Sequence, residues 1–252
     1  MYSSATPSRN WFDQGGQAYA RFRPDYPARL SAFLSSIAPD NDLALDVGCG
    51  NGQLTLQLAS HFAAVVGVDP SADQIANAVP HERIRYQCAP AERLPLPDRS
   101  ASLVTAAQAA HWFDLPVFYG EVRRVAVAGG ILALISYGAP RSEPGLEERF
   151  GRFYQEEIGP YWPAERRLVD TGYATIDFPF EELSAPRMDI RLDWNLAELL
   201  GYVSTWSAVR RAREAGREDV LRSFAHELAD AWGDAGIKRS ITWPLNMRVG
   251  RI

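Results

Sequence analysis

The stretch Leu43-Ala-Leu-Asp-Val-Gly-Cys-Gly-Asn-Gly52 decides the fold of this chain. Its apolar-rich first half predicts a buried strand over 43–47, and its glycine-rich second half predicts a loop that opens a helix near Gln53. Glycines at 48, 50 and 52 tolerate positive φ angles and let backbone approach a ligand closely. We therefore expect this loop to form a cofactor cradle.

The glycine spacing bears on which cofactor the loop holds. A dinucleotide fingerprint reads Gly-x-Gly-x-x-Gly, whereas here Gly52 comes one position early and Gln53 stands where that motif requires Gly or Ala. Asp46, an acid expected to be buried at the strand end, is also unusual in a nicotinamide site. The pattern disfavours NAD, although an NAD-dependent oxidoreductase stays open as an alternative.

Alternating strand and helix patterns follow the loop. Short apolar runs separated by helical periodicity are typical of βαβ units, which build a mostly parallel, doubly wound α/β sheet with helices on both faces. Asp114 is placed to cap the helix expected over 114–128, and Gly129-Gly130 to end it. The five predicted parallel strands are Leu43–Val47, Ala64–Val68, Ile84–Cys88, Ser102–Ala106 and Ile131–Tyr137.

We expect three parts along the chain: an N-terminal helical lid (1–40), a Rossmann-like core (41–138), and cap helices with C-terminal strands that complete the sheet (139–252). The cap is inserted after the fifth strand. Extended segments are expected at 177–180, 188–193 and 241–249, the last as the closing strand of the sheet. The expected cap helices cover 144–159, 164–171, 195–215 and 218–234.

Several motifs together resemble one family. Leu-Asp-Val-Gly-Cys-Gly-Asn-Gly at 45–52 and Val-Gly-Val-Asp-Pro-Ser at 66–71 resemble the first two motifs of class I S-adenosylmethionine (SAM)-dependent methyltransferases. Segments 89–95, 108–114 and 124–132 extend the resemblance to about half the chain. Tyr19–Pro27 and Thr205–Ser207 are similar to motifs of the type 11, trans-aconitate methyltransferase-like subgroup. The resemblance implies a Rossmann-like methyltransferase with SAM as cofactor and S-adenosylhomocysteine as product.

Roles for the cofactor site follow from that resemblance. Asp69, at the end of the second strand, can accept hydrogen bonds from the ribose hydroxyls, and Glu92 with Ala91 resembles the pair that reads the adenine amino group. Asp46 resembles the acid that orients the amino acid part of SAM, with a purely structural acid as the alternative. The full cofactor set is Tyr19, Arg23, Asp46, Gly48, Gly50, Gly52, Asp69, Pro70, Ala91, Glu92 and Gln108, with Tyr19 and Arg23 at the methionine carboxylate.

The acceptor side is expected at the end of the fourth strand and in the cap. His111 is the candidate catalytic residue, as a base for a phenol, alcohol or amine acceptor, and a packed histidine is its alternative. The subgroup resemblance implies instead a carboxylate acceptor, which needs no base because it is already ionised at pH 7. The candidate acceptor contacts are Trp112, Trp206, Ser207 and Arg210.

Composition narrows the partners. Twenty-six Lys+Arg against 31 Asp+Glu give a net charge of −5, which argues against binding nucleic acid through the overall field. Four arginines between 210 and 217 indicate a solvated face or a carboxylate contact. Two cysteines fit a reducing cytoplasm, no spacing indicates a metal site, and no run is long enough for a membrane span. A SAM-binding protein without catalysis remains an alternative of another class, and the oligomeric state is open.

Overall fold

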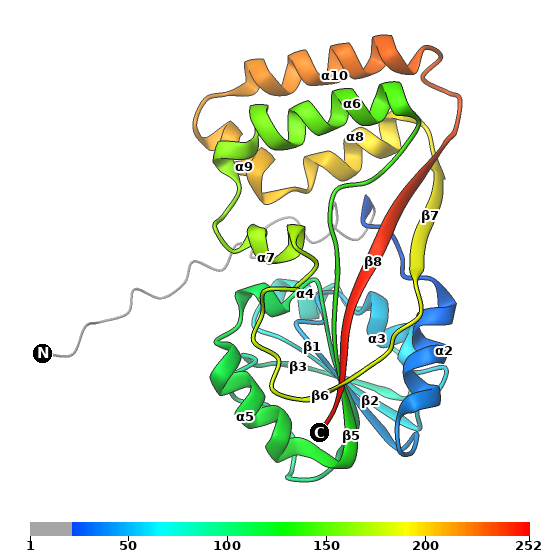
Figure 1. Cartoon of the computed structure of the whole chain (residues 1–252), viewed down its shortest axis with the longest axis vertical. Coiled ribbons are helices and arrows are strands. Elements are labelled where there is room, and N and C mark those ends of the chain that lie inside the picture. Colours follow the sequence, from blue (N-terminus) through cyan, green and yellow to red (C-terminus); the bar gives the residue numbers. More distant parts are fainter. Residues whose placement is uncertain (1–21) are drawn as a thin grey trace, which may run out of the picture.

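A computed structural model describes residues 22–252. Eight strands form one mixed sheet in the order β3-β2-β1-β4-β5-β8-β6, and β7 pairs with β8 (Figure 1). The first five strands are parallel neighbours, and β8 runs antiparallel to β5, which confirms the predicted doubly wound fold. The strands are β1 Leu43–Val47, β2 Ala64–Asp69, β3 Ile84–Cys88, β4 Ala101–Ala107, β5 Ala126–Tyr137, β6 Glu181–Leu183, β7 Met188–Trp194 and β8 Arg239–Arg251.

The helices differ from the sequence patterns mainly in the cap. The helix expected over 195–215 is two helices interrupted at Thr205 and Trp206, and that expected over 144–159 ends in a π-helical turn. The extended segment expected at 177–180 precedes the short strand β6. The helices and turns are α2 Ala28–Ile37, α3 Gln53–Leu58, α4 Ala72–Ala76, η1 Ala110–Trp112, α5 Leu115–Val125, α6 Pro144–Arg152, η2 Phe153–Glu157, η3 Gly159–Tyr161, α7 Arg166–Asp170, α8 Leu196–Ser204, α9 Ser207–Glu214 and α10 Glu218–Trp232.

Both faces of the central strands β1, β2, β4 and β5 are buried, as their composition predicts, whereas the edge strand β3 is partly exposed. Side chains alternate across a strand, so Ile131, Ala133 and Ile135 of β5 face one core and Leu132 and Leu134 face the other. The first core packs against α2, α3 and the cap, and the second against α5. This double burial explains why the strands read as nearly continuous apolar runs.

The end of α5 corrects one sequence expectation. The helix begins as predicted, since Asp114 caps it by accepting from the Val117 backbone N–H at 3.4 Å. It ends at Val125, however, and β5 starts at once with Ala126, so the glycine pair does not end the helix. Gly129 instead adopts φ +75° where the pairing of β4 with β5 shifts register. Irregular pairing beside the C-terminal strand, and not helix capping, requires glycine there.

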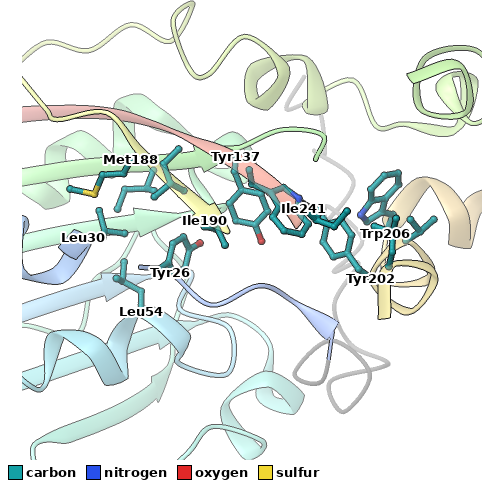
Figure 2. Packing of buried hydrophobic residues seen from close by; sticks show 14 of the residues in the cluster. Tyr26, Leu30, Leu54, Tyr137, Met188, Ile190, Tyr202, Trp206 and Ile241 are labelled. Carbon is teal, nitrogen blue, oxygen red and sulfur yellow. Dashed lines mark hydrogen bonds between the residues drawn. The ribbon is translucent and has the colours of Figure 1, made fainter. Parts of the chain in front are cut away.

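The predicted lid over 1–40 lies partly outside the described residues. Within the described part, α2 lies on the same sheet face as α3, and its Leu30 and Leu34 are fully buried in the core. Of residues 22–40, the segment before α2 reaches the site through Tyr26. There the ring of Tyr26 meets that of Tyr137 edge-on, with centroids 6.2 Å apart, at the junction of sheet and cap (Figure 2).

The cap is a layer of helices α6, α8, α9 and α10 beyond the carboxyl end of the sheet, joined to it by the long strands β7 and β8 (Figure 1). Stacked rings of Phe153 and Phe224, 3.7 Å between centroids, join η2 to α10. None of the helices within 22–252 has the length and apolar character that a bilayer span requires.

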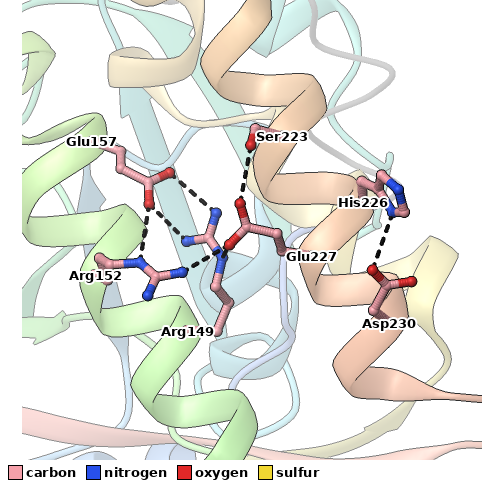
Figure 3. A network of polar contacts seen from close by, with 7 residues as sticks. All are labelled: Arg149, Arg152, Glu157, Ser223, His226, Glu227 and Asp230. Carbon is pink, nitrogen blue, oxygen red and sulfur yellow. Dashed lines mark hydrogen bonds and ion pairs between the residues drawn. The ribbon is translucent and has the colours of Figure 1, made fainter.

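A charged network also ties α6 to α10. The buried Arg149 donates to both oxygens of Glu157 at 2.9 and 3.1 Å and forms an ion pair with Glu227 at 2.9 Å (Figure 3). Its guanidinium also lies 4.9 Å from the ring centre of Phe224. Arg152 contacts the same two acids, but half of its side chain is exposed. Because Arg149 is buried, we expect its ion pairs to stabilise the fold more than those of Arg152.

We expect Arg149→Ala to lower the free energy of unfolding by about 2 to 3 kcal/mol, because it removes a buried guanidinium that pairs with two carboxylates and packs on Phe224, contacts that Arg152 replaces only in part. Arg152→Ala is the matched control and should cost less than about 1 kcal/mol, as exposed ion pairs do. Urea denaturation of both variants measures the difference. Equal losses would show that burial does not distinguish the two arginines.

Candidate active site

A cavity of about 710 Å³ lies at the carboxyl ends of the parallel strands. The strand order reverses between β1 and β4, and crevices at such switch points are where doubly wound sheets bind ligands. The cavity walls come from the loops after β1, β2, β3 and β4, with additional residues from the cap. The lining residues include Tyr26, Asp46, Gly48, Gly50, Asn51, Gln53, Asp69, Pro70, Gln74, Ala91, Glu92, Gln108, Trp112, Phe113, Asp114, Tyr137, Glu165 and Arg211.

The three loop glycines do different work. All have positive φ, at +69° for Gly48, +56° for Gly50 and +92° for Gly52. A Cβ on Gly48 would clash with Ala109, and one on Gly52 would clash with the Tyr86 hydroxyl, so these two glycines allow close packing within the protein. A Cβ on Gly50 would find only Gln74 Oε1, at 3.7 Å. Gly50 therefore keeps a wall of the cavity clear.

Asp69 holds the loop from the end of β2. One carboxylate oxygen accepts from the Gly50 N–H at 2.9 Å and the other from the Ser71 N–H at 2.8 Å. The residue lines the cavity and is 8% exposed. An acid with both oxygens fixed at the cavity wall can accept further hydrogen bonds from a diol, since each oxygen has two lone-pair sites.

Asp46 lies beneath the loop at the end of β1 and is almost fully buried. Its two oxygens accept the hydroxyls of Thr55 and Thr105, each at 2.7 Å. Burial raises the pKa of Asp46 to about 6, against the opposing effect of these two hydrogen bonds. A carboxylate kept in this environment is costly for the fold, which is typical of functional positions.

Two further groups face the cavity from the neighbouring loops. Glu92 accepts from the Asp114 N–H at 2.9 Å, which joins the loop after β3 to the start of α5. Gln108 ends β4 with a positive φ of 55° and donates from Nε2 to the Tyr137 carbonyl at 2.8 Å. Within residues 22–252 its buried Oε1 has no hydrogen-bond partner, nor has that of Gln74. Buried acceptors of this kind suit a ligand that donates hydrogen bonds.

The predicted anchors in the N-terminal extension are not seen at the cavity. Tyr19 lies outside the described residues. Arg23 does not line the cavity, and its guanidinium lies 5.5 Å from the ring centre of Tyr202. Its carbonyl accepts from Gln53 Nε2 at 3.3 Å, and the Tyr26 carbonyl accepts from Gln57 at 2.6 Å, so α3 holds this segment. Within residues 22–40, Tyr26 is the residue that lines the cavity.

His111 lies behind the cavity wall that Trp112 and Phe113 form. It is not among the lining residues, and its Nδ1 is 2.9 Å from the Tyr173 hydroxyl. Burial, with a smaller effect of the Arg166 charge, lowers the pKa of His111 to about 3. The imidazole is therefore neutral at pH 7.

The cap reaches the cavity through different residues from those expected. Trp206 is 4% exposed and packs among aromatic rings, including those of Phe150 and Trp162, and it does not line the cavity. Ser207 and Arg210 do not line it either, and Arg211 does, together with Glu165 from the turn before α7. The helical phase of α9 decides which of the adjacent arginines faces the cavity.

Known proteins with similar sequence and structure identify the family. A methyltransferase domain family matches residues 45–134. A Dictyostelium discoideum protein named as a methyltransferase is 35% identical over 238 residues, 91% of this chain and 90% of that protein. The chain belongs to the class I SAM-dependent methyltransferases.

Two further relatives extend this assignment. A solved structure from Anaeromyxobacter dehalogenans, described as a type II methyltransferase, has a TM-score of 0.85 and 44% identity over 91% of this methyltransferase and 98% of that chain. A malonyl-[acyl-carrier protein] O-methyltransferase from Marinomonas sp. is 31% identical over 187 residues, 69% of this methyltransferase and 67% of that protein. The trans-aconitate methyltransferase-like subgroup remains a prediction.

The cavity of this methyltransferase fits SAM. Gly50 leaves the wall clear where a side chain would enter, Asp69 presents a fixed carboxylate suited to a ribose diol, and Gln108 and Gln74 present acceptors that lack a protein partner. Glu92 with Ala91 lies on the wall as predicted for the adenine end, although the assignment of each contact stays a prediction. The described part of the chain contains no group of three or more His, Cys, Asp or Glu side chains placed to hold a metal ion.

Several lining residues are not among the predicted site residues, and they include Tyr26, Gln74, Tyr137, Glu165 and Arg211. Gly52, which is predicted for the cofactor site, does not line the cavity. Tyr26 lies within the motif at 19–27, so this motif could have indicated it. Arg211 belongs to the arginine cluster at 210–217, for which a carboxylate contact is one of the two interpretations. Gln74, Tyr137 and Glu165 carried no signal, because only the tertiary fold brings their elements to the carboxyl edge.

The Asp69 geometry predicts a loss of SAM affinity in Asp69→Ala of roughly 1.5 to 3 kcal/mol, the range for hydrogen bonds to a charged group. Gly50→Val should abolish binding, since its side chain would enter the cavity from a position of positive φ. Asp42→Ala, an exposed acid before β1, is the control and should bind normally. Calorimetry with SAM measures all three, and normal binding by both site variants would contradict the cofactor assignment.

Asp46 predicts a pH dependence of stability. Its folded pKa of about 6 exceeds the unfolded value of about 3.9, so the folded state holds the proton more tightly. Stability should fall as pH rises from about 4 through 6, by on the order of 2 to 3 kcal/mol.

Asp46→Asn should remove this loss and weaken SAM binding at least tenfold, because the neutral amide cannot attract the cofactor's ammonium. Urea denaturation between pH 4 and 8, with calorimetry at pH 8, measures both effects. Unchanged SAM affinity would favour the purely structural acid.

Proposed function

We propose that this methyltransferase methylates a carboxylate oxygen of a small molecule. When bound, SAM supplies a methyl group that is activated by its attachment to a sulfonium, and the leaving group is the neutral thioether of S-adenosylhomocysteine. The acceptor oxygen forms the new bond to the methyl carbon with one of its lone pairs, while the carbon–sulfur bond breaks and its electron pair stays on sulfur. No proton has to be removed from a carboxylate in this reaction.

The position of His111, outside the cavity lining and hydrogen-bonded through Nδ1 to the Tyr173 hydroxyl, is the observation that carries this proposal. A general base is most effective when its pKa lies near the working pH. The pKa of His111 is about 3, and its Nδ1 is engaged by Tyr173 behind the cavity wall. An imidazole of such low basicity is a poor acceptor for the proton of an alcohol or phenol. An acceptor that is already ionised avoids the need for it.

Three of the acids at the cavity hold neighbouring parts of the protein. Both oxygens of Asp46 accept threonine hydroxyls, and both oxygens of Asp69 accept backbone N–H groups. Glu92 holds the Asp114 backbone. The name of the Marinomonas relative also supports the proposal, since it describes an O-methyltransferase that acts on a malonyl group, whose free oxygen nucleophile is a carboxylate.

The contribution of the protein is then positional. In-line transfer requires acceptor, methyl carbon and sulfur to be aligned at near-attack distance, which can supply a large part of the rate enhancement. Trp112, Phe113 and Tyr137 give the cavity aromatic walls that limit water around the reacting groups. Two hydrogen bonds fix Gln108 beside these walls. Its side-chain Nε2 donates to the Tyr137 carbonyl, and its backbone N–H donates to the Ile135 carbonyl at 2.8 Å.

Release of S-adenosylhomocysteine over a panel of carboxylic acids, phenols, alcohols and amines tests the proposal. We expect turnover with carboxylic acids and a base-labile methyl ester as product. Turnover with phenols, alcohols or amines alone would contradict it.

His111→Ala separates the two acceptor classes. With a carboxylate acceptor we expect the variant to keep at least about a tenth of wild-type turnover and, at saturating SAM, the same pH profile as the wild type, because His111 stays neutral down to about pH 3. The exposed His226→Ala is the matched control. A loss of about 10² to 10⁴ in turnover of a folded, SAM-binding His111→Ala variant, together with an acid limb that the wild type shows and the variant lacks, would indicate general-base catalysis.

A further inference from the structure

The two cap residues that line the cavity, Glu165 and Arg211, have opposite charge. We infer that they select an acceptor with a single carboxylate: Arg211 binds that carboxylate, and Glu165 disfavours a second one. This inference rests on the proposed function, because it specifies which carboxylates the site accepts. It departs from the subgroup resemblance, whose eponymous acceptor, trans-aconitate, carries three carboxylates.

The two residues lie at the acceptor half of the cavity. Glu165 immediately precedes α7, which contacts both η1 and β5, so it lies on the side of β4 and β5. Arg211 lies on α9, which contacts η3, a turn that ends four residues before Glu165. Asp69 and Glu92, expected at the ribose and adenine, follow β2 and β3 on the other side of β1.

The charges on the walls favour one anionic group in the acceptor. Arg211 is the one Arg, Lys or His among the cavity-lining residues of the described chain, whereas five acids line the same cavity. A guanidinium can bind one carboxylate through two parallel hydrogen bonds. A second carboxylate would meet Glu165, and the repulsion between like charges at an interface discriminates strongly against the wrong ligand.

The substrate class that follows is a monocarboxylate whose remainder is neutral or cationic. The aromatic residues Trp112, Phe113 and Tyr137 provide surface for an apolar remainder. Glu165 provides a partner for a cationic one. Dicarboxylates and tricarboxylates should be poor acceptors even when they fit by size.

Two series of acids test this. Hexanoate, adipate and tricarballylate all have six carbons and carry one, two and three carboxylates. Benzoate, phthalate and trimesate carry one, two and three carboxylates on the same aromatic ring. Release of S-adenosylhomocysteine should show kcat/KM at least tenfold higher for the monocarboxylate of the productive series. Equal or faster turnover of the dicarboxylate or tricarboxylate would overturn the inference.

Variants assign the selection to the two residues. Arg211→Gln should raise KM for the monocarboxylate at least tenfold and leave the Kd for SAM within twofold, and Arg211→Lys should recover part of the loss by retaining the charge. Glu165→Gln should reduce the preference for one carboxylate over two at least fivefold. Arg213→Gln, an exposed arginine on the same helix, is the control and should behave as wild type.

The outcomes separate this inference from the proposed function. Methylation of carboxylates with normal KM in Arg211→Gln would overturn the role of Arg211 and leave carboxylate methylation standing. Turnover restricted to phenols, alcohols or amines would overturn both. An equal rise of the SAM Kd and the acceptor KM in Arg211→Gln would place Arg211 at the cofactor and also overturn the inference.

Discussion

The hydrogen bond from the Gly50 N–H to the Asp69 carboxylate is the contact on which the site depends. It joins the loop after β1 to the end of β2, at a distance of 2.9 Å, and so sets the width of the crevice between neighbouring parallel strands. The loop can take this course only because three of its residues adopt positive φ, and two of them pack where no side chain fits. Replacing the glycines would therefore alter the loop and the cavity together.

Beneath the loop, the burial of Asp46 lowers the stability of the fold at neutral pH but keeps an acid at the cofactor cavity. Asp46 is held among threonine hydroxyls in a place where ionisation is unfavourable, and its pKa rises accordingly. A neutral side chain of the same shape would serve the fold better at neutral pH. Retaining an acid there is expected where its charge acts on a ligand. His111 shows the reverse case, since burial removes a charge that catalysis of the proposed kind does not need.

The cap completes the site, and side-chain contacts between its helices hold it together in place of the backbone hydrogen bonds that join the strands of the sheet. Its helices are held by aromatic stacking and by the buried Arg149 network, so they form a firm layer over the carboxyl edge (Figure 3). The reversal of strand order in a doubly wound sheet creates the crevice where the cofactor binds. The cap residues that reach the cavity, Glu165 and Arg211, add the charges from which acceptor selection is inferred.

The sequence by itself determined the five parallel strands and the loops at their carboxyl ends that line the cavity. Local signals sufficed there: apolar runs marked the five parallel strands, and Asp46, the glycines, Asp69 and Glu92 all stand within a few residues of a strand end, where the parallel topology brings them to one edge. Only the tertiary structure decided the acceptor half. Whether Arg210 or Arg211 faces the cavity depends on the rotation of α9 against η3, and whether His111 faces ligand or core depends on Tyr173, which lies 62 residues along the chain. Side chains placed by packing between distant elements leave no periodic signal in the sequence, because any residue of suitable size can occupy either side of such a contact.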